Sequence, residues 1–258
     1  MPRTVPSLAT LLLLAPLLGT PTARAEAAPD HFLCYRSKSV AGTPKLVPRP
    51  GMAVLDALGA RAVHVFREER LCAPTDKNGE SPTAPAHPDH LRGYQLRKVT
   101  PHVDRVHGVA VVDQFGPLVL DLVKLDRLLV PARVSATATP PPPAPPAIDH
   151  FACYRIRRSP SSERFSPGAG VTLTDAFGTL ALDVLKPQKL CLPVDKNDEA
   201  PGAEQHEGLL VCYKVRRAAD APRFRRVTPL FTQDQIDPLV MDARRPEEIC
   251  VPATRVLP

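Results

Sequence analysis

Short stretches of alternating apolar and polar residues recur along this chain and predict β-strands. In residues 153–157, Tyr154 and Ile156 alternate with one cysteine and two arginines. This period of two is typical of a strand with one solvated face. The same alternation occurs at Tyr94 with Leu96 and at Tyr213 with Val215.

Each opening strand is followed by the same series of further elements. Residues 170–174 and 108–112 are rich in β-branched side chains and predict a second strand. A turn of the form Asp-x-Phe-Gly comes next, and residues 180–183 and 118–121 alternate again as a third strand. A short fourth strand ends at Cys-x-Pro, because proline interrupts a ladder. Residues 52–69 are also compatible with a helix.

The pattern repeats four times, over residues 30–80, 89–135, 148–199 and 207–253. Cys34 and Cys72 recur 119 residues later as Cys153 and Cys191. Within each half, the opening landmark of the second unit lies 59 residues after that of the first, at Gly93 and at Cys212. All four tyrosines directly follow the opening landmark. The chain is therefore a duplication of a duplication.

The fold class predicted from these units is all-β. A single unit of roughly 50 residues has too little core of its own, so we expect the units to pair. The prediction is two tandem, pseudo-symmetric domains, residues 30–135 and 148–258, each a β-sandwich or a barrel-like sheet. Residues 136–147 form the linker between them, and residues 140–146 contain six prolines in seven positions, which indicates a stiff spacer.

Residues 1–25 have the features of a secretory signal peptide. Arg3 precedes an apolar run at residues 8–18, and Ala-Arg-Ala at 23–25 predicts cleavage before Glu26. The run is too short for a spanning helix, so we expect no membrane span. The expected location is secreted or periplasmic.

Six cysteines in an exported chain favour disulfides. The opening and closing cysteines of units one, three and four lie 38 residues apart, which predicts the pairs Cys34–Cys72, Cys153–Cys191 and Cys212–Cys250. Unit two lacks both, with Gly93 and Leu129 in their places. Loss of both together is what a bond within the unit predicts. No C-x-x-C occurs, so a zinc or redox role is not favoured.

An aspartate lies 16 residues before each closing landmark: Asp56, Asp113, Asp175 and Asp234. We expect these residues to cap the turn, and a catalytic carboxylate is the alternative. His31, His90 and His150 share a second repeated position and are expected to bond locally, with a ligand or base role as the alternative. No signature of a nucleophilic, zinc or phosphate-loop enzyme is present.

Two segments resemble the opening of a calcium-binding loop, with Asp76 and Asn78 in one and Asp195 and Asn197 in the other. Neither has the bidentate glutamate that such a loop needs at its twelfth position. The prediction is therefore a polar connection between units, with no metal and no cofactor.

Basic residues alternate along the opening strands. The formal net charge is +6, which falls to +4 when Arg3 and Arg24 leave with the signal peptide. A shared basic face favours an anionic polysaccharide or another cell-envelope polyanion as partner, and a simple solvated face is the alternative. Nucleic acid is not expected for an exported chain of modest charge. The candidate binding residues are Arg36, Lys38, Arg97, Arg155, Arg157, Lys214 and Arg216.

The segments at 153–155, 113–116 and 190–197 together resemble an uncharacterised family of secreted bacterial cysteine-containing repeat domains. That resemblance covers nearly all of residues 30–253 and implies a compartment and a repeat, but no reaction. Unit two departs from it by lacking both cysteines, and unit four by Asp237 in the glycine position. We expect an exported, non-catalytic structural or binding module, since every prominent residue recurs with the repeat. A secreted hydrolase with a site between the domains and a glycan-binding protein are the alternatives.

Overall fold

The computed structural model describes residues 1, 31–143 and 147–256, and this part of the chain is all-β, as predicted. Its described residues form twelve strands and two short 3-10 helices, with no α-helix among them. The predicted signal peptide and part of the proline-rich linker lie outside the described residues. The elements are β1 His31–Ser39, β2 Arg49–Asp56, β3 Gly59–Lys77, η1 Ala84–Ala86, β4 Asp89–Thr100, β5 Val106–Asp113, β6 Gly116–Ser135, β7 His150–Arg158, β8 Gly168–Asp175, β9 Gly178–Lys196, η2 Ala203–Gln205, β10 Leu209–Arg217, β11 Val227–Gln233 and β12 Leu239–Arg255.

Each unit contains three strands, whereas the sequence predicted four. The predicted third and fourth strands are one continuous strand of 17 to 20 residues, namely β3, β6, β9 or β12. Shifts in strand pairing within the β3–β4 and β6–β7 pairs show how such a long strand bends without breaking. β2 and β3 also cover residues 52–69, so the helical interpretation of that segment is wrong.

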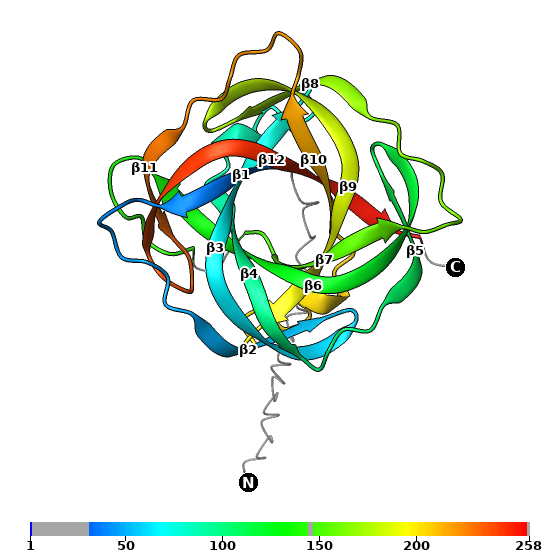
Figure 1. Cartoon of the computed structure of the whole chain (residues 1–258). Helices are drawn as coiled ribbons and strands as arrows, with labels where there is room; N and C mark the ends of the chain where they lie inside the picture. The colour runs from blue at the N-terminus through cyan, green and yellow to red at the C-terminus, as the bar shows by residue number, and fades with distance from the viewer. Residues whose placement is uncertain (2–30, 144–146, 257–258) are drawn as a thin grey trace.

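Eight of the strands close into a ring. Each of these strands pairs antiparallel with the next in the order β1, β3, β4, β6, β7, β9, β10 and β12, and β12 pairs with β1. Figure 1 looks along the axis of this ring. Closure satisfies the backbone groups of strands that would otherwise form open edges.

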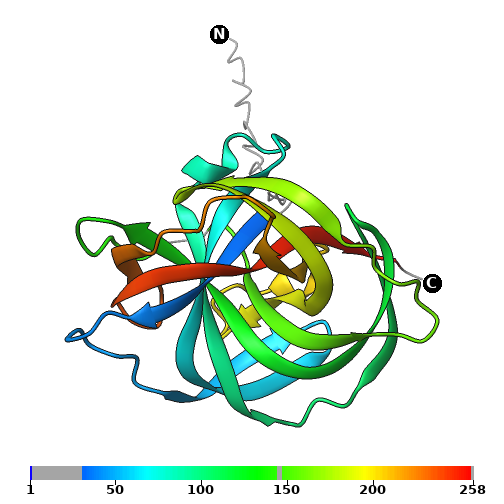
Figure 2. The same cartoon turned by 45° about the horizontal axis from the view of Figure 1, so that its top comes forward.

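The remaining four strands lie outside the ring and connect opposite units. Each forms a hairpin with the long strand of its own unit and also pairs with the far end of a long strand from the other half. These second pairings are β2 with β9, β8 with β3, β5 with β12 and β11 with β6. In Figure 1, β2, β5, β8 and β11 lie at four positions around the ring. Figure 2 shows β12 as one red band that crosses the molecule from β11 toward the C-terminus.

The prediction of two separate tandem domains is not confirmed, because both halves contribute to one sheet. β6 of the first half pairs with β7 of the second, and β1 pairs with β12. All four outer strands also pair across the halves. Opposite units of the predicted repeat complete one another instead.

Apolar side chains pack on both faces of the ring. The inner face holds the six cysteines with Phe32, Leu91, Leu129, Phe151 and Leu210, all buried. The outer face, which includes Leu33, Tyr35 and Leu71, packs against the outer hairpins in a larger cluster. Alternation along each strand therefore separates two cores. The sequence predicted one solvated face, but in β7 both faces are buried at first and exposed residues occur only toward the end of the strand.

The four tyrosines connect opposite units through the four repeated aspartates. Each tyrosine hydroxyl donates to the Oδ2 atom of an aspartate in the opposite unit, over distances of 2.5 or 2.6 Å. The pairs are Tyr35 with Asp175, Tyr94 with Asp234, Tyr154 with Asp56 and Tyr213 with Asp113. A hydrogen bond from a hydroxyl to a carboxylate is strong when both groups are withdrawn from water.

The same aspartates cap their own turns, as the sequence predicts. The Oδ1 atom of Asp113 accepts from the amide of Phe115 at 2.7 Å, and Asp56, Asp175 and Asp234 make the equivalent bond. Gly116 follows with a φ of +111°, which a side chain would disfavour. Burial raises the pKa of Asp113, and the hydrogen bond from Tyr213 opposes that rise. The repeated aspartate is thus a turn cap and a link between units.

Removing one tyrosine hydroxyl tests these links. Tyr213→Phe leaves the Oδ2 atom of Asp113 without its partner, so we expect a loss of about 1–3 kcal/mol in the free energy of unfolding. Tyr154→Phe is the matched variant, and it should cost less because Arg61 also pairs with Asp56 at 3.2 Å. Urea unfolding followed by circular dichroism measures both. Equal stability of wild type and Tyr213→Phe would contradict a structural role for the link.

Candidate functional site

The candidate site begins with four equivalent positions that carry unlike charges. Two residues before each closing landmark, the four units place Arg70, Arg127, Lys189 and Glu248. Each lies two residues from an inward-facing cysteine or from Leu129, so alternation places all four side chains inside the ring. At this position the four units therefore differ, since three of them carry a cation and the fourth carries an anion.

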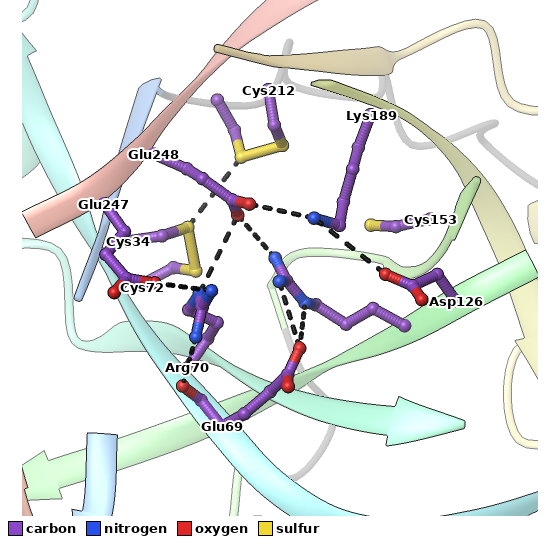
Figure 3. Close-up of polar contacts among 12 residues, drawn as sticks. Cys34, Glu69, Arg70, Cys72, Asp126, Cys153, Lys189, Cys212, Glu247 and Glu248 are labelled. Carbon is purple, nitrogen blue, oxygen red and sulfur yellow. Dashed lines mark hydrogen bonds and ion pairs between the residues drawn. A yellow bond between two sulfur atoms is a disulfide. The ribbon is translucent and has the colours of Figure 1, made fainter. Parts of the chain in front are cut away.

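Glu248 is the centre of this cluster (Figure 3). Its Oε2 atom lies 2.5 Å from Nη1 of Arg127, and its Oε1 atom lies 2.8 Å from Nζ of Lys189. Nε of Arg70 lies 4.0 Å from the same carboxylate. The side chains of Arg127 and Glu248 are only 2% and 3% exposed, so this is a buried ion pair.

Neighbouring carboxylates balance the three cations. Glu69 lies 3.1 Å from Arg127, Glu247 lies 2.5 Å from Arg70, and Asp126 lies 4.0 Å from Lys189. Figure 3 shows these contacts around the carboxylate of Glu248. A buried charge without such partners would carry a large desolvation cost.

The pKa of the central carboxyl reflects these contacts. Burial alone would raise the pKa of Glu248, but attraction to Arg127, Lys189 and Arg70 outweighs burial and holds the pKa well below its usual range. Burial lowers the pKa of Lys189, with Arg127 acting in the same direction. Glu248 is therefore ionised, which makes it unsuitable as a proton donor in the neutral range.

Gly93 explains why unit two lacks its cysteines. A Cβ atom at this position would lie 2.8 Å from Cβ of Arg70 and 3.1 Å from Cδ of Arg127. It would also lie 3.2 Å from Cδ2 of Leu129, which stands in the closing cysteine position. The space that a disulfide occupies in the other units is here taken by the charged cluster.

Three hollows open at the end of the ring next to this cluster, with volumes of about 790, 670 and 650 Å³. Arg70 lines all three. They lie beside the ends of β7, β10 and β1, so they are equivalent places in units three, four and one. We call this end of the molecule the basic mouth and define it by the residues that line the three hollows.

Six of the seven predicted binding residues line these hollows. Arg155 and Arg157 line the largest, Lys214 and Arg216 the second, and Arg36 and Lys38 the third. The seventh, Arg97, lines none of them and lies over the ring of Phe66, 3.4 Å from its centroid. The structure therefore brings together basic residues that are far apart in the sequence.

The basic mouth contains further cations that were not predicted from the sequence. Ten residues after their opening tyrosines, units one, three and four hold Lys45, Arg164 and Arg223, and each of these lines one hollow. Their regular spacing was visible in the sequence. They lie in the loop after the opening strand, however, where apolar and polar residues do not alternate and no shared face can be predicted. Lys186 and Arg245 also line hollows, from the long strands.

The predicted calcium candidates serve as backbone acceptors. The side-chain oxygens of Asp76 and Asp195 accept from the amides of Ser81 and Ala200, and those of Asn78 and Asn197 accept from the amides of Thr172 and Ala53. The last two bonds connect opposite units. Lys77 and Lys196 place their ammonium groups in these loops, against Glu80 and Glu199. Among the described residues, no group of three or more His, Cys, Asp or Glu side chains is arranged to hold a metal ion.

Two of the repeated histidines contact the neighbouring unit of their own half. His31 lies 2.9 Å from Oε1 of Gln114, and His150 lies 2.6 Å from Oε1 of Gln235. Burial lowers the pKa of His90 and of His150 to about 4 in each case. These side chains lie at the start of their strands, at the end of the ring away from the basic mouth.

The three predicted disulfides are confirmed. Cys34–Cys72, Cys153–Cys191 and Cys212–Cys250 join directly paired residues of neighbouring ring strands. The sulfur atoms of Cys34 and Cys250 lie 3.8 Å apart, so successive bonds touch. The disulfides thus form a layer inside the ring, and the charged cluster lies next to this layer on the same inner face.

Comparison of the chain with protein-family models, with curated proteins and with solved structures finds no match. In the described residues, no helix has the length and apolar character needed to cross a membrane.

Glu248→Gln tests the charged cluster. The change leaves Arg127 and Lys189 partly unpaired in the ring, and we expect a loss of about 3–5 kcal/mol in the free energy of unfolding at neutral pH. The matched variant is Glu247→Gln, whose side chain is 20% exposed, and it should cost no more than about 1 kcal/mol. Thermal and urea unfolding measure both.

The pH dependence gives an independent check of the same cluster. Because the folded pKa of Glu248 lies below its ordinary value of 4.5, its stabilising effect is complete above that value and is lost as the pH falls below it. The stability difference between wild type and Glu248→Gln should therefore shrink in acid. A difference that stays constant from neutral pH into acid would contradict the assigned charge.

Proposed function

We propose that this chain is an exported, non-catalytic binding module whose ligand is an anionic polysaccharide, held at the basic mouth. One observation carries the proposal: opening strands from three of the four units deliver cations to one end of a single ring. Clustered cations on a concave surface raise the local concentration of a polyanion and speed its association. Three disulfides fit an oxidising compartment outside the cytosol.

Several of these cations are available to a ligand. Lys38, Arg157 and Lys214 are exposed, and within the described residues they form no ion pair with a carboxylate. Arg155 and Arg216 are held by Asp126 and Asp183 at 2.9 and 3.0 Å. The first three therefore act as the main contacts, and the two arginines paired with aspartates supply hydrogen-bond donors in fixed positions at the rim.

The arrangement favours a polymer over a single small anion. Three hollows of similar size share Arg70, so consecutive charged units of one chain meet cations in more than one hollow. Many weak contacts of this kind add up, although each exposed pair contributes only about 0.2–1 kcal/mol. The ion-paired cluster around Glu248 forms the floor of the basic mouth, so the proposed site is on the surface.

A secreted hydrolase is the second candidate, and Glu68 is the observation that favours it. This residue lines the hollow of unit one, and burial raises its pKa to about 7, against the opposing effect of Arg92. A carboxyl with such a pKa is suited to proton donation at neutral pH. Glycoside hydrolysis also requires a second carboxylate at a matching distance, so we rank binding first.

Titration with a galacturonate octasaccharide tests the proposal. Residues 26–258 should bind it with an affinity that falls steadily as salt is raised, and neutral dextran should not bind. The double variant Arg157→Gln/Lys214→Gln removes two unpaired cations and should weaken binding about fivefold or more. Isothermal titration calorimetry measures the affinities.

Arg255→Gln is the control, because this exposed residue lies at the far end of β12, about 20 Å along the strand from Glu248. Its affinity for the octasaccharide should equal that of the wild type. Binding that ignores salt, or that is unchanged in the double variant, would reject the basic mouth as the site. Release of new reducing ends during the titration, abolished by Glu68→Gln, would favour the hydrolase.

A further inference from the structure

We propose that a second site, a lateral apolar pocket, binds a small amphiphile that carries a protonated amine. The pocket has a volume of about 300 Å³ and lies away from the basic mouth. Its apolar wall consists of Leu58, Val109, Leu122, Leu190, Leu192 and Leu209. Most small-molecule sites combine an apolar wall with a few polar groups at one side, and this volume is at the lower end of their range.

The internal repeat identifies a second place in the fold that is equivalent to this pocket. Leu58 and Leu209 correspond, at a spacing of 119 residues, to Phe177 and His90. In that other place the rings of Phe177 and His90 lie 6.1 Å apart between centroids. The ring of Phe177 there is larger than the side chain of Leu58 here.

The polar side of the pocket specifies the ligand. The Oε2 atom of Glu204 is buried and has no hydrogen-bond partner, while Gln205 donates to its other oxygen at 3.3 Å. Leaving a buried carboxylate oxygen unpaired is costly, so a ligand that supplies a donor gains affinity at this point. Glu207 also lines the pocket, and the one arginine among its lining residues is Arg255. With two glutamates and one arginine among these residues, the polar side favours a ligand with a cationic hydrogen-bond donor.

Size and charge together define the occupant. A cavity of about 300 Å³ is at the lower end of the range for small-molecule sites, so its occupant is small. The aliphatic wall takes an unbranched or cyclic hydrocarbon body, and each buried methylene contributes about 0.8 kcal/mol. The ammonium group then pairs with Glu204 at the rim. An alkylamine meets all three requirements.

Binding of n-octylamine to residues 26–258 tests this inference, measured by isothermal titration calorimetry with n-octanol and octanoate as comparisons. Leu58→Phe copies the residue of the equivalent place and should weaken n-octylamine binding about tenfold or more. Glu204→Gln removes the charge without changing the shape, and it should weaken n-octylamine binding about tenfold. The affinity for n-octanol should stay within about twofold in Glu204→Gln, since the amide still accepts a hydrogen bond.

Three results would overturn the proposal: equal n-octylamine binding by wild type and Leu58→Phe, equal binding by wild type and Glu204→Gln, or tighter binding of octanoate than of n-octylamine. Glu204 lies on a short surface segment, so its variant remains informative if Leu58→Phe is unstable. Arg157→Gln/Lys214→Gln should bind n-octylamine as the wild type does. This control separates the two sites. If the basic mouth were rejected as the polyanion site, the proposal for the lateral pocket would still stand.

Discussion

The hydrogen bond from a tyrosine hydroxyl to an aspartate of the opposite unit is the interaction on which this structure depends. Each aspartate must first shape its own turn with one oxygen and then offer the other oxygen to the opposite unit. The turn of one unit and the ring strand of another are therefore positioned by the same side chain. Backbone pairing between the outer strands and opposite long strands adds to this link. No unit completes its own core.

The disulfides and the charged cluster are alternative ways of filling the inside of the ring. In three units a disulfide joins neighbouring strands and fills the space with sulfur. In unit two, Gly93 leaves that space to Arg127, which pairs with Glu248 of unit four. The residues that the units share therefore form the scaffold, and the positions where the units differ hold the charged cluster. The lateral pocket also lies where units differ, since Leu58 corresponds to Phe177.

The sequence predicted local features well because their causes are local. Alternation predicted the opening strands, the spacing of cysteines predicted all three disulfides, and Asp-x-x-Gly predicted the turns. The basic residues at alternate positions of β1, β7 and β10 were also recognised, since one strand face is readable from a period of two.

The features that were missed depend on which strands become neighbours. Tyr35 and Asp175 lie far apart in the chain, and nothing near either residue indicates that they bond. The bend in each long strand depends on pairing shifts against its partners, which made one strand look like two. The cluster around Glu248 became visible only once closure of the ring had brought four equivalent positions together. Its trace in the sequence is the unlike charge at a repeated position.

Expression of the first half alone, residues 26–139, tests the central claim most directly. In that fragment every tyrosine lacks its aspartate, and β1 and β6 become open edges of the ring. Our account predicts that the fragment is unfolded or that two copies assemble so that each replaces the missing half of the other. Analytical ultracentrifugation with circular dichroism distinguishes these states. A folded monomer with cooperative unfolding would contradict the claim that opposite units complete one another.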